Sequence, residues 1–113
     1  MNPAASYVAL GAAIILEVVG TTFLQKSEQF TKMTPTLVMA ACYLCAFYFL
    51  SLALKTIPVG LAYAIWSGMG IVLISAVGYF VFRQSLDTAA MVGLGFIALG
   101  VVIVNGFSKS TAH

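Results

Sequence analysis

The segment YVALGAAIILEVVGTTFL, from Tyr7 to Leu24, decides how the rest of this 113-residue sequence is interpreted. It is an apolar run close to the roughly 20 residues that an α-helix needs to cross the hydrocarbon core of a bilayer. Glu17 lies near its middle. An ionised group at that depth costs on the order of 3 kcal/mol or more, so an intramembrane carboxylate is by default a functional site that faces protein or water.

The residues that share the Glu17 face of this helix lie three, four or seven positions away from it. Among them Ala13, Gly20 and Thr21 are small, which leaves room beside the carboxylate for a ligand or another helix. An alternative is that Glu17 is a buried polar group that fixes helix packing. The sequence offers no basic residue at bilayer depth to pair with it, which favours a functional role.

The composition excludes an ordinary soluble domain. Hydrophobic residues make up 62% of the chain and charged residues only 7%, against about a quarter in soluble domains. The five basic residues are scattered, so no nucleic-acid partner is expected. Cys42 and Cys45 have CxxC spacing, but no second ligand pair could complete a zinc site, so we interpret them as small apolar residues of a helix. No metal and no cofactor are expected.

Four apolar segments separated by short polar breaks predict an all-α integral membrane protein, with a single four-helix membrane domain over residues 1–113. The expected helices cover about 4–24, 36–54, 59–82 and 88–107. Pro35 suits the first turn of the second helix, and Asp87 suits the N-cap of the fourth. Because short connections make neighbouring helices antiparallel, both chain ends are expected on one side of the membrane.

The basic residues give almost no bias under the positive-inside rule. Lys26, Lys32 and Arg83 fall on one side of the membrane, and Lys55 and Lys109 on the other. Either weak signals still select one orientation, or the chain has dual topology and inserts both ways. Transporters often pair inverted repeats around a midplane site, which four helices alone are too few to enclose. Dual topology would supply the pair as an antiparallel homodimer with eight helices and two copies of the central carboxylate.

Aromatic residues at helical spacing are candidates to line a site for an organic cation beside Glu17. The second segment carries Tyr43 and Phe47, and the third carries Tyr63 and Trp66. Aromatic faces attract cations by about 0.5 to 2 kcal/mol per contact. Helix packing is the competing role, and it is the preferred one for Phe47. The polar edges of the other three rings need partners, which favours the site.

Glycines in the third and fourth segments indicate two further roles. Gly68 and Gly70, near the middle of the third segment, either form a hinge or allow close helix packing. In the fourth segment, two glycines seven residues apart share one face, a stripe that suits helix–helix association, and an asparagine near its end could add a hydrogen bond. The predicted dimer contact comprises Gly93, Ile97, Gly100 and Asn105.

The chain resembles the small multidrug resistance transporters over essentially its whole length. The motifs that carry the resemblance are LEVVGTT around Glu17, SEQF after the first helix, KTIPVGLAYAIWSGMGIVLIS through the third and RQSLD before the fourth. The resemblance implies proton-coupled export of cationic compounds by an antiparallel homodimer in the bacterial inner membrane, with Glu17 as the shared proton and substrate site. The residues that it implies as lining of this site are Tyr7, Thr21, Tyr43, Tyr63 and Trp66.

The EVVGTT and AYAIWSG motifs resemble the polyspecific quaternary-ammonium branch of the family more than the guanidinium-export branch. The expected function is therefore antiport of protons against lipophilic cations such as quaternary ammonium drugs and dyes. The alternatives are an exporter of guanidinium or another small cation and, in a different class, a non-transporting membrane assembly protein. An enzyme is not expected, because the sequence has no Ser–His or metal constellation and its one histidine, His113, lies in the polar tail.

One residue departs from the family pattern. The family usually places a lysine where this chain has Gln25, and here the lysine is Lys26. Any role that the family gives to that lysine therefore does not transfer directly, whereas the chemistry expected of Glu17 is unaffected.

Overall fold

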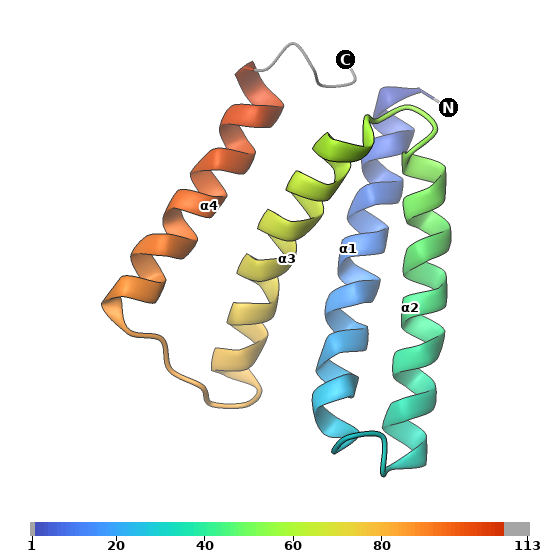
Figure 1. The fold of residues 1–113 in the computed structure, drawn as a ribbon, viewed down its shortest axis with the longest axis vertical. Helices are drawn as coiled ribbons and strands as arrows, with labels where there is room; N and C mark the ends of the chain where they lie inside the picture. The colour runs from blue at the N-terminus through green and yellow to red at the C-terminus, as the bar shows by residue number, and fades with distance from the viewer. Residues whose placement is uncertain (1, 108–113) are drawn as a thin grey trace. The chain divides into compact units, whose positions relative to one another are not determined.

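This computed structural model describes residues 2–107, so Lys109 and His113 lie outside the described residues. Four helices make up this part of the chain, with no strand in residues 2–107 (Figure 1). They are α1 (Pro3–Lys26), α2 (Met33–Ala53), α3 (Val59–Phe80) and α4 (Thr88–Phe107). All four are long and apolar enough to cross a membrane. The prediction of an all-α chain with four such helices is confirmed.

The first helix is longer than predicted at both ends, and the second begins earlier than predicted. α1 begins at Pro3, where the Asn2 Oδ1 atom accepts a hydrogen bond of 2.7 Å from the Ala5 N–H. It continues to Lys26 rather than ending near residue 24, and the Ser27 N–H donates to the Leu24 carbonyl at 3.2 Å. α2 begins at Met33, three residues earlier than predicted, and tolerates a proline in its first turn.

The connection between the last two helices is also defined by backbone geometry. α3 ends at Phe80, earlier than predicted, and Arg83 then adopts a left-handed φ of 58° that a helix cannot continue. The Gln84 N–H donates to the Gly78 carbonyl at 2.9 Å, which closes the turn. The Asp87 Oδ1 atom accepts from the Ala90 N–H at 2.8 Å, so the predicted N-cap of α4 is confirmed.

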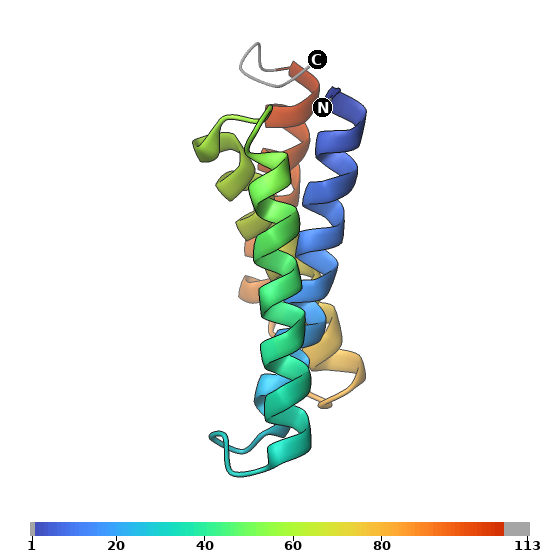
Figure 2. The same ribbon diagram turned by 90° about the vertical axis from the view of Figure 1, so that its right-hand side faces the viewer.

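The contacts divide the chain into two units, and each is a helical hairpin. The first unit, up to Thr56, pairs α1 with α2, which lie side by side in both Figure 1 and Figure 2. The second unit, from Ile57, pairs α3 with α4. The assignment of residues 1–113 to a single membrane domain stays a prediction.

α4 is apolar along its whole length, yet none of its residues, 88–107, is buried. Large side chains such as Phe96, 69% exposed, project from it without cover. A helix of this composition is stable where lipid or another helix surrounds it, since water would not solvate such a surface.

Candidate functional site

Glu17 is half-buried in α1 and is held by a chain of two side-chain hydrogen bonds. The Thr21 Oγ1 hydroxyl, one turn further along α1, donates to the Glu17 Oε1 atom at 3.2 Å. The Tyr43 hydroxyl of α2 lies 2.8 Å from the same Thr21 oxygen. The sequence predicted all three residues as members of one site, and in the first unit they form one hydrogen-bonded group.

The direction of these bonds follows from the hydroxyl chemistry. A threonine hydroxyl has a single hydrogen, and Thr21 donates it to Glu17. Tyr43 must then donate its own hydrogen to Thr21. Both hydrogens of the chain therefore point toward Glu17, which suits an ionised carboxylate because that group only accepts. The arrangement links the charge on α1 directly to a side chain of α2.

Gly20 allows the Tyr43 ring to reach this position. A Cβ atom placed on Gly20 would lie 2.7 Å from the Cδ1 and Cε1 atoms of Tyr43 and 3.2 Å from the Cβ atom of Cys42. The ring therefore packs directly on the α1 backbone, in space that any other residue would fill. The predicted small face beside Glu17 thus serves the approach of α2 and its tyrosine.

Two other predicted lining residues of α1 lie nearer its N-terminus. Ala13, one turn before Glu17, is fully buried. The Tyr7 hydroxyl is buried and has no hydrogen-bond partner among the described residues. Tyr7 precedes Glu17 by ten positions, about 15 Å along a helix, so one helix does not bring the two side chains together. Their place in a common site stays a prediction.

The remaining aromatic candidates are on α2 and α3. Phe47 follows Tyr43 by one turn of α2, and it is 58% exposed. In the second unit, the rings of Tyr63 and Trp66 stack with their centroids 6.0 Å apart and an interplanar angle of 19°. Tyr63 is 59% exposed and Trp66 is half-buried. The role of these rings at a substrate site stays a prediction.

Gly68 is a point of close contact between α3 and α4. A Cβ atom on Gly68 would overlap the Cγ2 atom of Val101 and lie 3.4 Å from the Cγ2 atom of Ile97. α3 runs through Gly68 and Gly70 as one helix from Val59 to Phe80. The contact at Gly68 supports close helix packing as the role of this glycine. A hinge at Gly68 and Gly70 stays a prediction.

The four residues of the predicted dimer contact on α4 differ in their surroundings. Gly93 and Gly100 have open space where a Cβ would project, so another helix could approach them. Ile97 is 36% exposed and also faces Gly68 of its own chain. The Asn105 Nδ2 atom donates to the Val101 carbonyl of its own helix at 3.2 Å. One hydrogen of this amide is thus used within α4, and the place of Asn105 in a dimer contact stays a prediction.

Comparison with known protein families matches residues 5–97 to the family described as Small Multidrug Resistance protein. The chain belongs to the small multidrug resistance family. This confirms the membership that the sequence motifs predicted.

Three relatives in this family are close to the chain in sequence and length. The chain is 52% identical over 101 residues to the Quaternary ammonium compound-resistance protein QacE of Escherichia coli, covering 89% of this chain and 92% of that protein. It is 47% identical over 108 residues to the Quaternary ammonium compound-resistance protein QacF of Klebsiella aerogenes, covering 96% and 98%. It is 48% identical over 113 residues to the Multidrug transporter EmrE of Escherichia coli (strain K12), covering 100% of both.

The family agrees with two further predictions. Members such as EmrE are transporters, so the chain belongs to a transporter family and not to a family of enzymes. Bacterial relatives together with four membrane-spanning helices indicate a multi-pass bacterial membrane protein.

Sequence reasoning missed a polar stripe that continues from Glu17 toward the end of α1. Thr21 and Gln25 follow Glu17 at intervals of four, which is helical spacing, and Glu28 lies just beyond the end of α1. That periodicity was the available signal. An apolar segment that ends at Leu24 predicts only the first step of the stripe, from Glu17 to Thr21.

We expect Gly20→Ala to destabilise the first unit, because the new methyl group overlaps the Tyr43 ring. Overpacking of this kind costs about 1 to 3 kcal/mol. Gly11→Ala is the matched control, since it lies in the same helix with nothing within 4 Å of the added atom and gains helix propensity. Unfolding by sodium dodecyl sulfate, followed by circular dichroism, measures both. Equal stability of the two variants would contradict the contact.

Proposed function

We propose that this chain is a proton-coupled antiporter that exports lipophilic cations, such as quaternary ammonium drugs and dyes, across the bacterial inner membrane. The observation that carries the proposal is the half-buried Glu17 carboxylate, held by Thr21 within an apolar helix. The names of two relatives, quaternary ammonium compound-resistance proteins, support the substrate class. The name of a third, a multidrug transporter, supports export of more than one compound.

Competition for one carboxylate is sufficient to couple the two fluxes. An apolar surrounding disfavours the charged form of a carboxylate, whereas a nearby cation favours it. A proton and an organic cation therefore exclude each other at Glu17. If the site faces one side of the membrane at a time, a proton that enters from outside releases the cation there, and the next cation releases the proton inside.

The hydrogen bonds around Glu17 give this exchange a mechanical link to α2. An ionised Glu17 accepts from Thr21, which in turn accepts from Tyr43. A protonated carboxyl group has a hydrogen of its own to donate, so it no longer needs the bond in this direction. Binding of a proton or a cation thus changes the hydrogen bonds that connect Tyr43 to α1. A ligand can drive a conformational change only through such a difference in contacts between two states.

The assembly that we propose is an antiparallel homodimer of chains with opposite topology. Two observations support it. α4 is apolar with no buried residue, and its glycines 93 and 100 are open to a close approach. The pair would place two Glu17 carboxylates in one site.

Proton release from purified protein tests the coupling. Adding tetraphenylphosphonium, a cation that carries no titratable proton, to dimers in weakly buffered detergent solution should acidify the medium. The release should saturate with the same concentration dependence as binding measured by equilibrium dialysis. Saturable binding without proton release would contradict antiport and leave a cation-binding protein of another kind.

We expect Glu17→Gln to abolish proton release and proton-driven export while the chain still folds and dimerises. The amide removes the charge that binds the cation and the group that binds the proton, but it keeps an oxygen that can accept from Thr21. Asp87→Asn is the matched control, because it also removes one carboxylate and asparagine still caps α4. Full export by Glu17→Gln would overturn the mechanism and favour the alternative of a membrane assembly protein.

Substrate selectivity separates the quaternary-ammonium exporter from the guanidinium exporter. Uptake of tetraphenylphosphonium and of guanidinium into proteoliposomes can be compared under the same proton gradient. A preference for guanidinium would replace the proposed substrate class with small polar cations and leave the role of Glu17 unchanged.

Dual topology is expected from the three-to-two division of basic residues, with Lys109 in the part of the chain that the structure does not describe. Two lysines added to the tail should bias all copies toward one orientation and lower export. Labelling of single cysteines placed at each chain end, from either side of the membrane, measures the orientations. A single orientation in the unaltered chain would contradict the antiparallel dimer.

We expect Trp66→Leu to weaken tetraphenylphosphonium binding about thirtyfold, which corresponds to a desolvated cation–π contact of about 2 kcal/mol. Trp66 is the only tryptophan of the sequence, so its emission in the unaltered chain should be quenched by the ligand and recover at low pH. Phe96→Leu is the control, since it removes an exposed ring from α4. Unchanged affinity in Trp66→Leu would place the indole outside the site.

A further inference from the structure

A groove of about 670 Å³ lies at the C-terminal end of α1, over the connection to α2. Its lining residues are Thr21, Leu24, Gln25, Glu28, Gln29 and Phe30. They supply a hydroxyl, two amides, a carboxylate and an aromatic ring, and no basic side chain. Such a lining suits a ligand that is cationic and partly apolar.

The groove reaches the hydroxyl that holds Glu17. Thr21 is a lining residue, and it also donates to the Glu17 carboxylate. Lys26, the last residue of α1, follows Glu17 by nine positions, about 14 Å along a helix, and half of the hydrocarbon core is about 15 Å thick. Glu28 lies two residues beyond this helix end. The groove therefore extends from the neighbour of the mid-membrane carboxylate to a second carboxylate at the depth of the membrane surface.

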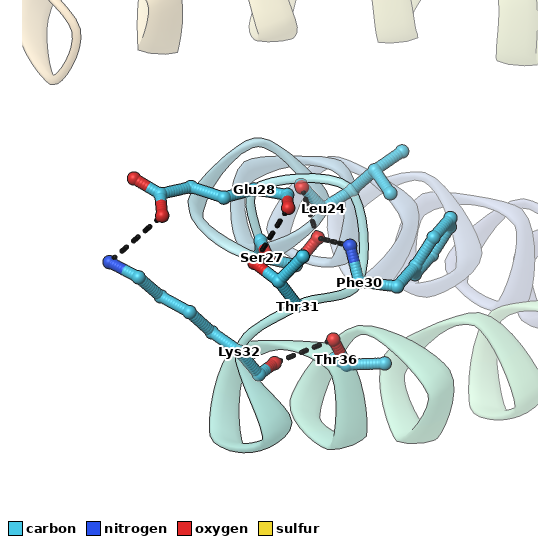
Figure 3. A network of polar contacts seen from close by, with 7 residues as sticks. All are labelled: Leu24, Ser27, Glu28, Phe30, Thr31, Lys32 and Thr36. Carbon is cyan, nitrogen blue, oxygen red and sulfur yellow. Dashed lines mark hydrogen bonds and ion pairs between the residues drawn. The ribbon is translucent and has the colours of Figure 1, made fainter.

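The connection that carries Glu28 and Phe30 is fixed by hydrogen bonds (Figure 3). Ser27 is fully buried, and its hydroxyl donates to the Leu24 carbonyl at 2.7 Å and accepts from the Phe30 N–H at 3.1 Å. The Thr31 hydroxyl donates to the Glu28 carbonyl at 2.8 Å. These bonds hold the two groove residues in place relative to the end of α1.

This connection also adopts an unusual backbone conformation. Glu28, Gln29 and Phe30 have φ values of 49°, 63° and 67°, all in the left-handed region, and none of them is glycine. Each such residue costs on the order of 1 kcal/mol, and strain of this kind is often found at ligand-binding sites. Both Phe30, which is 61% exposed, and Glu28 line the groove, and their side chains project from opposite sides of the connection (Figure 3).

The Glu28 carboxylate already forms an ion pair with a lysine. The Lys32 Nζ atom lies 3.4 Å from Glu28 Oε2, and both side chains are more than half exposed (Figure 3). An exposed pair of this kind is weak, so another cation can displace the lysine. The carbonyl ends of α1 add partial negative charge at the same place. The local field therefore favours a positive charge in the groove.

We propose that this groove is a second, weaker site for organic cations, at which a cation waits on its way between the membrane surface and Glu17. The proposal rests on the proposed transport function. In it the Glu28 carboxylate attracts the cation, the Phe30 ring binds its apolar surface, and Lys32 competes for the carboxylate. Thr21 marks the inner end of the path.

A waiting site affects rates and leaves the final affinity unchanged. Removing it raises the barrier equally for association and dissociation at Glu17, so both rate constants fall while the dissociation constant stays the same. The effect of one surface charge should be about threefold at low ionic strength and should vanish in high salt. Removing the competitor Lys32 should instead accelerate association.

The test uses purified dimers and tetraphenylphosphonium, with association followed by stopped-flow proton release and affinity by equilibrium dialysis. Glu28→Gln should slow association about threefold at low ionic strength. Asp87→Asn, which removes the same charge from the other exposed acidic position, should leave it unchanged. Lys32→Gln should accelerate association more than Lys26→Gln, because Lys32 pairs with Glu28, whereas the Lys26 ammonium lies 5.7 Å from the centroid of the Phe23 ring. Equal rates in Glu28→Gln and Asp87→Asn would overturn the proposal.

A second measurement isolates the groove from Glu17. In the Glu17→Gln background, millimolar tetraphenylphosphonium should still shift the nuclear magnetic resonance signals of Phe30, and adding Glu28→Gln should abolish the shift. Phe30 signals that ignore the cation would overturn the groove site. Absence of proton release from the unaltered chain would instead overturn the proposed function, so the two failures are distinguishable.

Discussion

A carboxylate in the middle of an apolar helix must find its hydrogen-bond donors inside the protein, because lipid supplies none. In this chain the donor is Thr21, one turn away, and the Tyr43 hydroxyl completes the group from α2. The second bond is possible only if α2 lies close to α1 at this level. The close packing of the Tyr43 ring on Gly20 meets that condition. The hydrogen bonds of Glu17 and the close packing of α1 on α2 thus involve the same tyrosine.

In the second unit a glycine also permits close helix packing, but no charged residue is involved. Gly68 brings α3 against Val101 of α4, where any side chain would clash. Lipid is as apolar as leucine, so burial of apolar surface gives little force for helix association in a membrane. Close van der Waals contact through small residues is then the main source of attraction. A glycine inside a helix costs roughly 0.5 to 1 kcal/mol, and contacts of this kind offset that cost.

Helix identity and the central carboxylate could be predicted from the sequence, because both depend on local periodicity and on the thickness of a bilayer. Thr21 could be placed beside Glu17 because four positions complete one helical turn. Its contact with Tyr43 could not be derived, since it depends on the register between two helices. The bond from the Asn105 amide to a carbonyl of its own helix also could not be derived, since the sequence does not fix the side-chain conformation. The left-handed run after Ser27 escaped prediction because it contains no glycine.

The number of hydrogen-bond donors around Glu17 distinguishes a ligand-binding carboxylate from one that only stabilises helix packing. An ionised carboxylate has about four lone-pair positions, and a group that serves only structure is usually saturated by donors. Among the described residues, Thr21 occupies one of these positions, and Glu17 keeps partial exposure. The remaining lone pairs are available to a proton or to a cation. A carboxylate that is oriented by one hydroxyl and otherwise unsatisfied can exchange its ligand without unfolding the hairpin that holds it.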